Sequence, residues 1–178
     1  MLFRTCLIAL ALLMLACSGA QTHVATAAEI QAELSTLNSL EAKVFPKGIA
    51  EGTDTTRGWP YVRAAEAFAE AYQEHEAVPG VLMKAAGIAN GTKWSNKSIQ
   101  LWGYVWRRYP DHKRAPEALF YQGFVVDTKF KDYTLAKKYY DQFLRSYPNH
   151  ELAGQVRELL KVAEQGGKLP PVPSAPQN

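Results

Sequence analysis

The sequence is poor in cysteine and lacks the short motifs that mark common enzyme classes. Its 178 residues contain two cysteines, Cys6 and Cys17. No Gly-x-Ser-x-Gly elbow, glycine-rich phosphate loop or His-Glu-x-x-His pair occurs in the chain. The sequence therefore predicts a protein that is not an enzyme and that needs no cofactor and no metal.

Charge of one sign is also lacking. The chain has 20 Lys and Arg residues against 17 Asp and Glu residues, for a formal net charge of +3. Proteins that bind nucleic acid usually present a strongly basic face. We therefore expect no nucleic acid among the partners of this chain.

The segment from Met1 to Ala16, "MLFRTCLIALALLMLA", combines one early cation, Arg4, with an apolar run that is short for a membrane span. This pattern predicts a secretory signal peptide. The run ends in Leu15-Ala16-Cys17-Ser18, which resembles the lipobox of bacterial lipoproteins. That resemblance implies lipidation at Cys17, and Ser18 after it favours the outer membrane over the inner one. The alternative is an ordinary signal peptide, cut near Ala20 or Ala28.

The rest of the chain divides by composition. Residues 17–28 are small and polar, as in a flexible lipidated tether. Residues 29–45 have apolar side chains at helical spacing and predict one amphipathic helix, followed by a loop over 46–58. Residues 59–165 predict six more helices, opening near Trp59, Pro79, Lys97, Ala115, Tyr133 and Glu151. The proline-rich tail, 166–178, is expected to be disordered.

One corner recurs within the helical region. "RRYPDHKRAPEAL" from Arg107 returns as "RSYPNHELAGQVR" from Arg145 and, more faintly, as "EAYQEHEAVPGVL" from Glu70. The three corner tyrosines, Tyr72, Tyr109 and Tyr147, are spaced almost evenly along the chain. A period of this length indicates stacked supersecondary units, here pairs of helices that bury their apolar faces against their neighbours.

The best unit resembles a tetratricopeptide repeat (TPR). Gly123 is at the expected close approach, Ala136 at the helix crossing, Tyr140 and Phe143 on the packing face, and Pro148 at the helix end. One residue more than usual separates Gly123 from Ala136. The long corner is similar to the TPR subclass of bacterial envelope lipoproteins, the BamD and Tol-Pal coordinator type. The resemblance implies an all-α, right-handed superhelical stack of antiparallel helix pairs, a TPR-like solenoid.

In TPR arrays the first helix of each pair lines a groove that receives a peptide or a partner helix. Phe120 and Phe124 are the expected anchors for an apolar partner side chain. The alternative is that the helix at 29–45 or the tail covers both. Counted from Gly123, the resemblance implies a groove lined by Glu117, Phe120, Phe124, Asp127, Thr128, Met83, Gly87, Asn90, Gln155, Glu158 and Val162.

Three other features allow two interpretations each. The corner histidines His75, His112 and His150 suggest a metal, but corners of stacked helices lie too far apart for shared coordination, so solvent-facing residues are favoured. The basic cluster, defined as Arg107, Arg108, Lys113 and Arg114, could meet an acidic partner but is more typical of a solvated corner. The aromatic residues on the second helices suggest sugar stacking but favour a core: Trp94, Trp102, Trp106, Tyr139 and Tyr140.

Repeat class and export signal together predict a non-catalytic scaffold for protein–protein interaction. We expect a lipoprotein anchored to the outer membrane through Cys17, facing the periplasm, that acts in envelope assembly or coordination with unidentified envelope proteins. One alternative is an accessory ligand-binding lipoprotein of an outer-membrane uptake system. The other is a self-associating structural module.

Overall fold

A computed structural model describes residues 25–46 and 57–167. All regular structure within these two ranges is helical, which confirms the prediction of an all-α protein. The predicted signal peptide, Cys17, most of the predicted tether and loop, and residues 168–178 of the tail lie outside the described residues. No helix in the described part of the chain is both long enough and apolar enough to cross a membrane.

Helix α1 (Ala27–Val44) begins in a unit that comprises residues 1–34 and continues into a second unit, residues 35–178. Its start is fixed by a reciprocal capping box. The Thr26 backbone N–H donates to Glu29 Oε2 at 2.7 Å, and the Glu29 N–H donates to Thr26 Oγ1 at 3.3 Å. The helix therefore starts two residues before the predicted Glu29.

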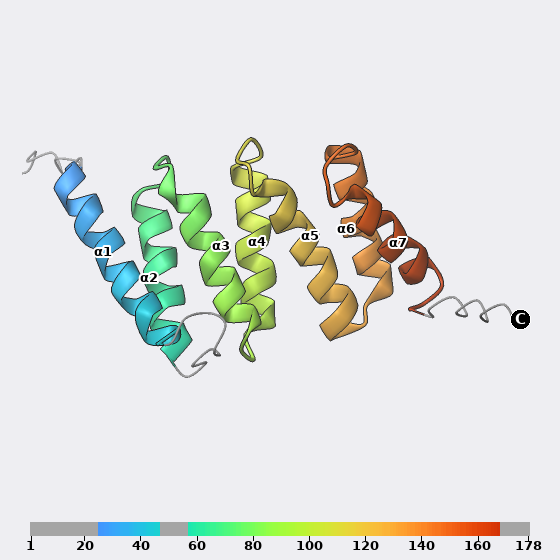
Figure 1. Ribbon diagram of the computed structural model, residues 1–178, viewed down its shortest axis with the longest axis horizontal. Coiled ribbons are helices and arrows are strands. Elements are labelled where there is room, and N and C mark those ends of the chain that lie inside the picture. Colours follow the sequence, from blue (N-terminus) through green and yellow to red (C-terminus); the bar gives the residue numbers. More distant parts are fainter. Residues whose placement is uncertain (1–24, 47–56, 168–178) are drawn as a thin grey trace, which may run out of the picture. The chain divides into compact units, whose positions relative to one another are not determined.

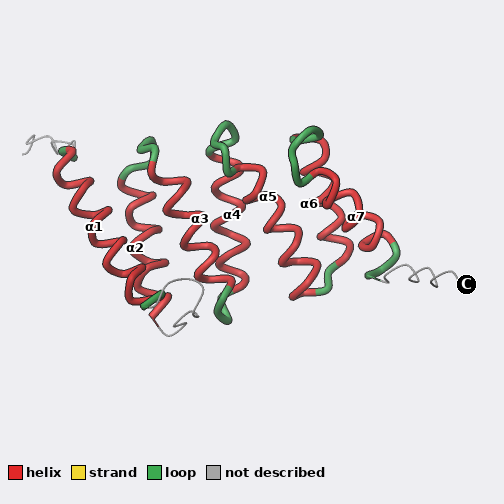
Figure 2. The backbone as a smooth tube through the Cα atoms, viewed as in Figure 1, coloured by secondary structure: helices red, strands yellow, loops and turns green. Residues whose placement is uncertain are grey.

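Within residues 57–167 the second unit has six further α-helices, each packed on the next in chain order (Figure 1). The helices are α2 (Gly58–Ala71), α3 (Ala77–Asn90), α4 (Ser95–Arg108), α5 (Ala115–Val125), α6 (Tyr133–Ser146) and α7 (Ala153–Glu164). Figure 2 shows that the turns after α2, α4 and α6 all lie at the same edge.

The end of α2 and the start of α4 differ from the sequence prediction. Helix α2 ends at Ala71 rather than at the predicted His75, because the residues after it form the recurring corner. Helix α4 begins at Ser95, two residues before the predicted Lys97, and its N-cap residue, Trp94, makes no side-chain hydrogen bond to the helix. The Ser95 hydroxyl instead accepts a hydrogen bond from Lys129 Nζ at 3.2 Å.

A five-residue π-helix, η3 (Val126–Phe130), follows α5. A π turn is wider than an α turn and typically accommodates one inserted residue. It lies between Gly123 and Ala136, where the sequence has one residue more than the TPR pattern. Lys131 then adopts the left-handed conformation (φ 56°), and Asp132 caps α6 by accepting the Leu135 N–H at 2.9 Å. The extra residue is thus confined to the end of one helix.

Helices α5 and α6 approach closely at Gly123. A Cβ on this residue would lie 2.9 Å from Tyr140 Cε1 and 3.0 Å from Tyr139 Cβ. Ala136, Tyr140 and Phe143 are fully buried beside it, as predicted for the packing face of α6. The same core includes apolar residues of α5 and α7, namely Leu119, Phe120, Ala153, Val156 and Ala163.

Polar contacts also join helices that are not adjacent in the chain. Lys97 of α4 pairs with Glu66 of α2 at 2.9 Å, and Lys84 of α3 pairs with Glu41 of α1. Lys129 of η3 donates to the backbone carbonyl of Asn90, the last residue of α3. These helices therefore make polar contacts beyond their neighbours in the chain, in addition to the packing between neighbouring helices.

Candidate functional site

The three corners share one backbone geometry. The N–H groups of Tyr72, Tyr109 and Tyr147 each donate to the carbonyl four residues earlier, at 2.7 to 2.9 Å. The N–H of the corner histidine then donates to the tyrosine carbonyl, at 2.8 to 3.2 Å. Its own carbonyl accepts from the residue three positions later, at 2.8 to 3.0 Å. The recurrence in sequence is therefore a recurrence in conformation.

The histidine side chains close these corners. Nδ1 of His75, His112 and His150 accepts the backbone N–H two residues ahead, at 3.1, 3.2 and 3.2 Å. In two corners the imidazole also meets a phenylalanine edge-on, Phe68 at 5.9 Å and Phe143 at 5.8 Å. All three histidines are half-buried. The histidines are therefore partly rather than fully exposed to solvent, and the Nδ1 of each caps one backbone N–H at the start of the next helix.

This geometry predicts a pH-dependent contribution to stability at His112. Burial, aided by the cations of Lys113 and Arg114 and opposed by Glu117, lowers the pKa of the His112 imidazole. Its neutral form is favoured in the folded chain. The contribution is therefore fully present above the unfolded-state pKa of about 6.5 and is lost as pH falls through the lower folded-state pKa.

Urea unfolding of wild type and of His112→Asn measures this contribution. Asparagine can accept the same N–H without titrating. We expect the stability of wild type relative to the variant to fall between pH 7.5 and pH 5. A difference that does not change with pH would contradict the proposed role of the neutral ring.

Among the groove residues that the TPR resemblance implied on α5 and η3, some lie in the core and others reach the surface. Phe120 is 6% exposed and Asp127 is 7% exposed. Asp127 accepts the Tyr140 hydroxyl at 2.9 Å, and burial together with this bond raises the pKa of Tyr140. Phe120 stacks on Phe124, with ring centroids 5.6 Å apart. Both buried residues serve the core and are not available to a partner.

Four of the residues of α5 and η3 that reach the surface lie at helical spacing and form a stripe. We define the α5 stripe as Glu117, Tyr121, Phe124 and Thr128, which follow one another at intervals of four, three and four positions. Tyr121 is 37% exposed and Phe124 is half-buried. The Tyr121 ring stacks on the buried Trp102 of α4, with centroids 5.2 Å apart. The TPR resemblance missed Tyr121, although this helical spacing from Glu117 could have indicated it.

The ends of the α5 stripe are polar. Glu117 accepts Arg114 Nε at 2.9 Å, and the Thr128 hydroxyl donates to the Phe124 carbonyl at 2.6 Å. The aromatic centre therefore lies between two polar groups. This is the composition that protein-binding surfaces favour, with an apolar core and a polar rim.

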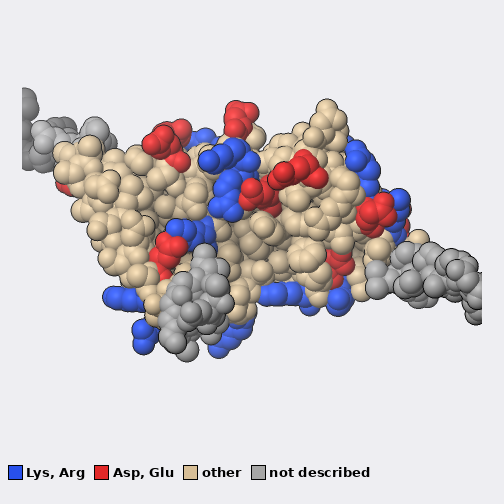
Figure 3. All heavy atoms as spheres, viewed as in Figure 1, with Lys and Arg blue, Asp and Glu red and all other residues tan. Residues whose placement is uncertain are grey.

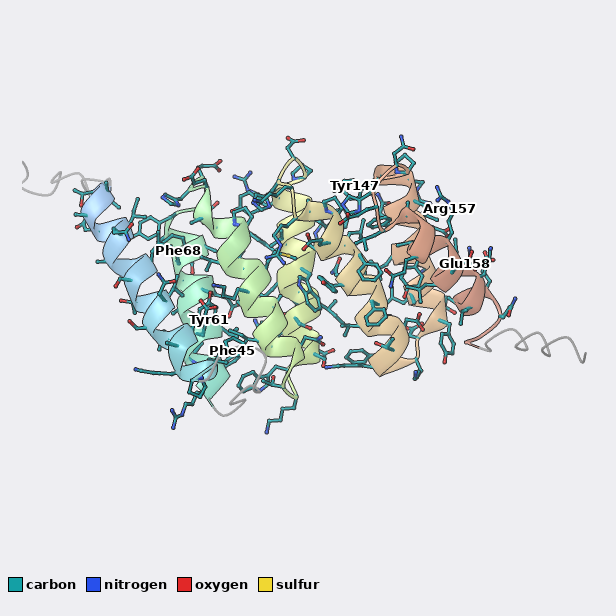
Figure 4. The ribbon with its side chains drawn as sticks, in the orientation of Figure 1. Phe45, Tyr61, Phe68, Tyr147, Arg157 and Glu158 are labelled. Atoms are coloured by element: carbon teal, nitrogen blue, oxygen red, sulfur yellow. The ribbon has the colours of Figure 1, made fainter. Side chains whose placement is uncertain are left out.

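The remaining predicted groove residues lie on α3 and α7. Met83 is buried at 3% exposure, whereas Gly87 is exposed. Asn90 is half-buried, and its Oδ1 is buried and has no hydrogen-bond partner among the residues that the structure describes. On α7, Gln155 and Glu158 are exposed and Val162 is half-buried (Figure 4). The sequence-predicted groove thus combines surface and core positions.

Two of the four residues of the basic cluster form ion pairs, and a third lies beside an aromatic ring. Arg108 pairs with Glu74, Arg114 pairs with Glu117, and the Arg107 guanidinium lies 5.5 Å from the Trp106 ring centroid. On the face seen in Figure 3, basic and acidic side chains are interspersed above α4 and α5. These contacts favour the solvated-corner interpretation over an acidic partner.

The aromatic residues of the second helices divide between core and half-buried positions. Trp102 is 3% exposed and Tyr140 is fully buried, whereas Trp94, Trp106 and Tyr139 are half-buried. Trp106 Nε1 donates to Gln122 Oε1 at 2.6 Å, and Gln122 Nε2 donates to the Ile99 carbonyl at 2.7 Å. These contacts link α4 to α5, which supports a packing role.

No group of three or more His, Cys, Asp or Glu residues within 25–46 and 57–167 is arranged to hold a metal ion. The chain matches no protein-family model and no curated protein sequence, so the functional assignment rests on the corners and the α5 stripe.

Proposed function

We propose that this chain is a non-catalytic scaffold for protein–protein interaction, built as a TPR-like array of helix pairs. The observation that carries the proposal is the α5 stripe. Tyr121 and Phe124 offer aromatic surface on a helix that is held in place on both sides, by α4 and α6. Exposed aromatic residues on a rigid support are typical anchors for a partner.

The corners support the TPR-like array. Three corners with the same hydrogen bonds, separated by nearly equal lengths of chain, give each helix pair an equivalent connection to the next. The close approach at Gly123 and the contacts between alternate helices are what a two-layer stack of helix pairs requires. A right-handed superhelix of such pairs is the arrangement we propose.

The cellular location that we propose for the scaffold rests on residues 1–18. An apolar segment that ends before Cys17 supports export and lipidation. Several acyl chains on one cysteine give stable attachment, so the helical domain needs no membrane-binding surface of its own. We propose an outer-membrane lipoprotein that faces the periplasm and gathers envelope proteins for assembly or coordination.

A capture experiment tests the scaffold. The full-length protein is crosslinked mildly in its own cells and purified, and the partners and the N-terminal peptide are identified by mass spectrometry. The double variant Tyr121→Ala with Phe124→Ala is expected to lose at least about tenfold of the captured partner, because two anchors of about 1 kcal/mol or more each are removed. Its helical circular dichroism signal should stay near that of wild type.

The matched control is Phe130→Ala with Leu135→Ala. These side chains are 45% and 37% exposed, outside the α5 stripe. The control should retain the partner. Equal capture by both double variants would contradict a binding role for the stripe, and an unmodified Cys17 in the N-terminal peptide would contradict the lipid anchor.

A further inference from the structure

A cleft of about 360 Å³ lies between α2, α3 and α4, and none of its lining residues belongs to the α5 stripe. Helix α2 supplies one wall through positions spaced by three and four residues, and α4 supplies the other. Leu82 of α3, 2% exposed, is among the apolar residues at its base. The cleft is lined by Glu66, Ala69, Glu70, Gln73, Leu82, Gln100, Leu101 and Tyr104.

The two walls are joined at both ends of the cleft. At one end Lys97 Nζ binds Glu66 Oε1 at 2.9 Å. At the other end the Tyr109 hydroxyl donates to the Gln73 carbonyl at 2.7 Å, and Arg108 pairs with Glu74. These contacts set the separation of α2 and α4 before any ligand arrives. Such preorganisation reduces the entropic cost of binding.

The charged residues that line the cleft are all acidic. Two acidic residues, Glu66 and Glu70, line the cleft, and no lysine or arginine is among the lining residues. Glu66 is already bound by Lys97, whereas the Glu70 carboxylate has no hydrogen-bond or ion-pair partner within the described residues. Tyr104 adds an aromatic ring that is 37% exposed. The base is apolar, formed by Ala69, Leu82 and Leu101.

These features suit one kind of ligand group. A long cationic side chain can lay its methylene groups on apolar surface while its charged head meets a carboxylate. A guanidinium also stacks on an aromatic face and donates two parallel hydrogen bonds to one carboxylate, which an ammonium cannot do. The volume is near the lower limit of ligand pockets, roughly 300–1,000 Å³, so it fits one side chain better than a large ligand.

We propose that this cleft is a second binding site, which receives an arginine side chain of a partner polypeptide between Glu70 and Tyr104. The site is independent of the α5 stripe. A partner could therefore be held through an arginine at the cleft while another contacts the stripe.

The test is calorimetric titration of the full-length chain, in a neutral detergent, with the peptide acetyl-Gly-Leu-Arg-Leu-Gly-amide. The matched probe replaces arginine with citrulline, which has nearly the same shape but no charge. We expect saturable binding of the arginine peptide and at least about tenfold weaker binding of the citrulline peptide, the size of one charge-assisted hydrogen bond.

Variants locate the site. Glu70→Gln keeps the shape of the side chain and should remove the preference for arginine over citrulline. Tyr104→Leu should weaken the arginine peptide severalfold through loss of the cation–aromatic contact. Glu158→Gln, which removes an exposed carboxylate on α7, and the double variant Tyr121→Ala with Phe124→Ala should bind as wild type does.

The proposal would be overturned by a lack of saturable binding of the arginine peptide, by equal affinity for both peptides, or by an unchanged preference in Glu70→Gln. Loss of binding in the stripe variant would also overturn it, because the peptide would then occupy the α5 stripe. Failure of the capture experiment, in contrast, leaves the cleft intact, since neither of its variants alters a lining residue.

Discussion

Replacement of His75, His112 and His150 together by alanine is expected to lower the free energy of unfolding by the cost of three lost helix caps. Each substitution removes the acceptor of one backbone N–H at the start of a helix. Loss of one such hydrogen bond costs about 0.5–1.5 kcal/mol, and the effects of well-separated sites add. Urea unfolding at pH 7.5 measures the loss.

The triple asparagine variant is the matched control. The asparagine side-chain oxygen occupies nearly the position of the imidazole Nδ1 and can accept the same N–H. It should recover most of the stability, except for the ring contacts with Phe68 and Phe143. If alanine and asparagine variants unfold at the same urea concentration, the capping role is wrong.

Gly123→Ala is expected to lower the free energy of unfolding by about 1–3 kcal/mol, the usual cost of overpacking a core. The new methyl group would lie 2.9 Å from Tyr140 Cε1 and 3.0 Å from Tyr139 Cβ. The Tyr140 ring has little freedom to move, because it is fully buried and its hydroxyl binds Asp127. The clash must therefore be relieved by a shift of α5 against α6.

Gly87→Ala provides the opposite expectation in another helix. A Cβ at Gly87 meets nothing within 4 Å, so only the helix preference of alanine remains. That preference should raise the stability by roughly 0.5–1 kcal/mol. Chemical denaturation of both variants measures the contrast, and a Gly123→Ala variant as stable as wild type would show that this glycine does not set the separation of α5 and α6.

The positions of the helices could be predicted because the sequence marks their limits. Tyrosine–proline pairs end α4 and α6, and the paired glycines after α7 adopt the left-handed conformation that favours glycine (φ 66° and 77°). The sequence also marks the start of α1, because Thr26 and Glu29 have the spacing of a capping box. The sequence does not mark the start of α4, because the Ser95 side chain binds Lys129 rather than a backbone N–H of its own helix.

The surface of α5 was harder to predict than its bounds. Phe120 and Tyr121 are neighbours of similar size, and only packing against α4, α6 and α7 decides which of them is buried. The core takes Phe120, and the stack on Trp102 leaves one side of Tyr121 exposed. The TPR pattern counted from Gly123 therefore could not show which of these two adjacent aromatic residues is buried.

The cleft and the histidine caps depend on contacts between residues far apart or on exact side-chain geometry. Tyr109 reaches Gln73 across 36 positions of the chain, and Lys97 reaches Glu66 across 31. Contacts between residues so far apart in the chain leave no pattern of residue spacing from which they could be predicted. The sequence has one residue more than the TPR pattern before Ala136, but only the structure shows that a π turn lies in this interval.

The self-contained corners have a consequence for how such a chain can change its length. Every corner is closed by hydrogen bonds within one short stretch of chain, from the last turn of one helix to the first turn of the next. A duplication or deletion of one whole period, such as residues 115–152, would leave each remaining corner chemically intact. We therefore expect copy number to vary among evolutionary descendants of this chain by complete helix pairs, while the corner residues stay fixed.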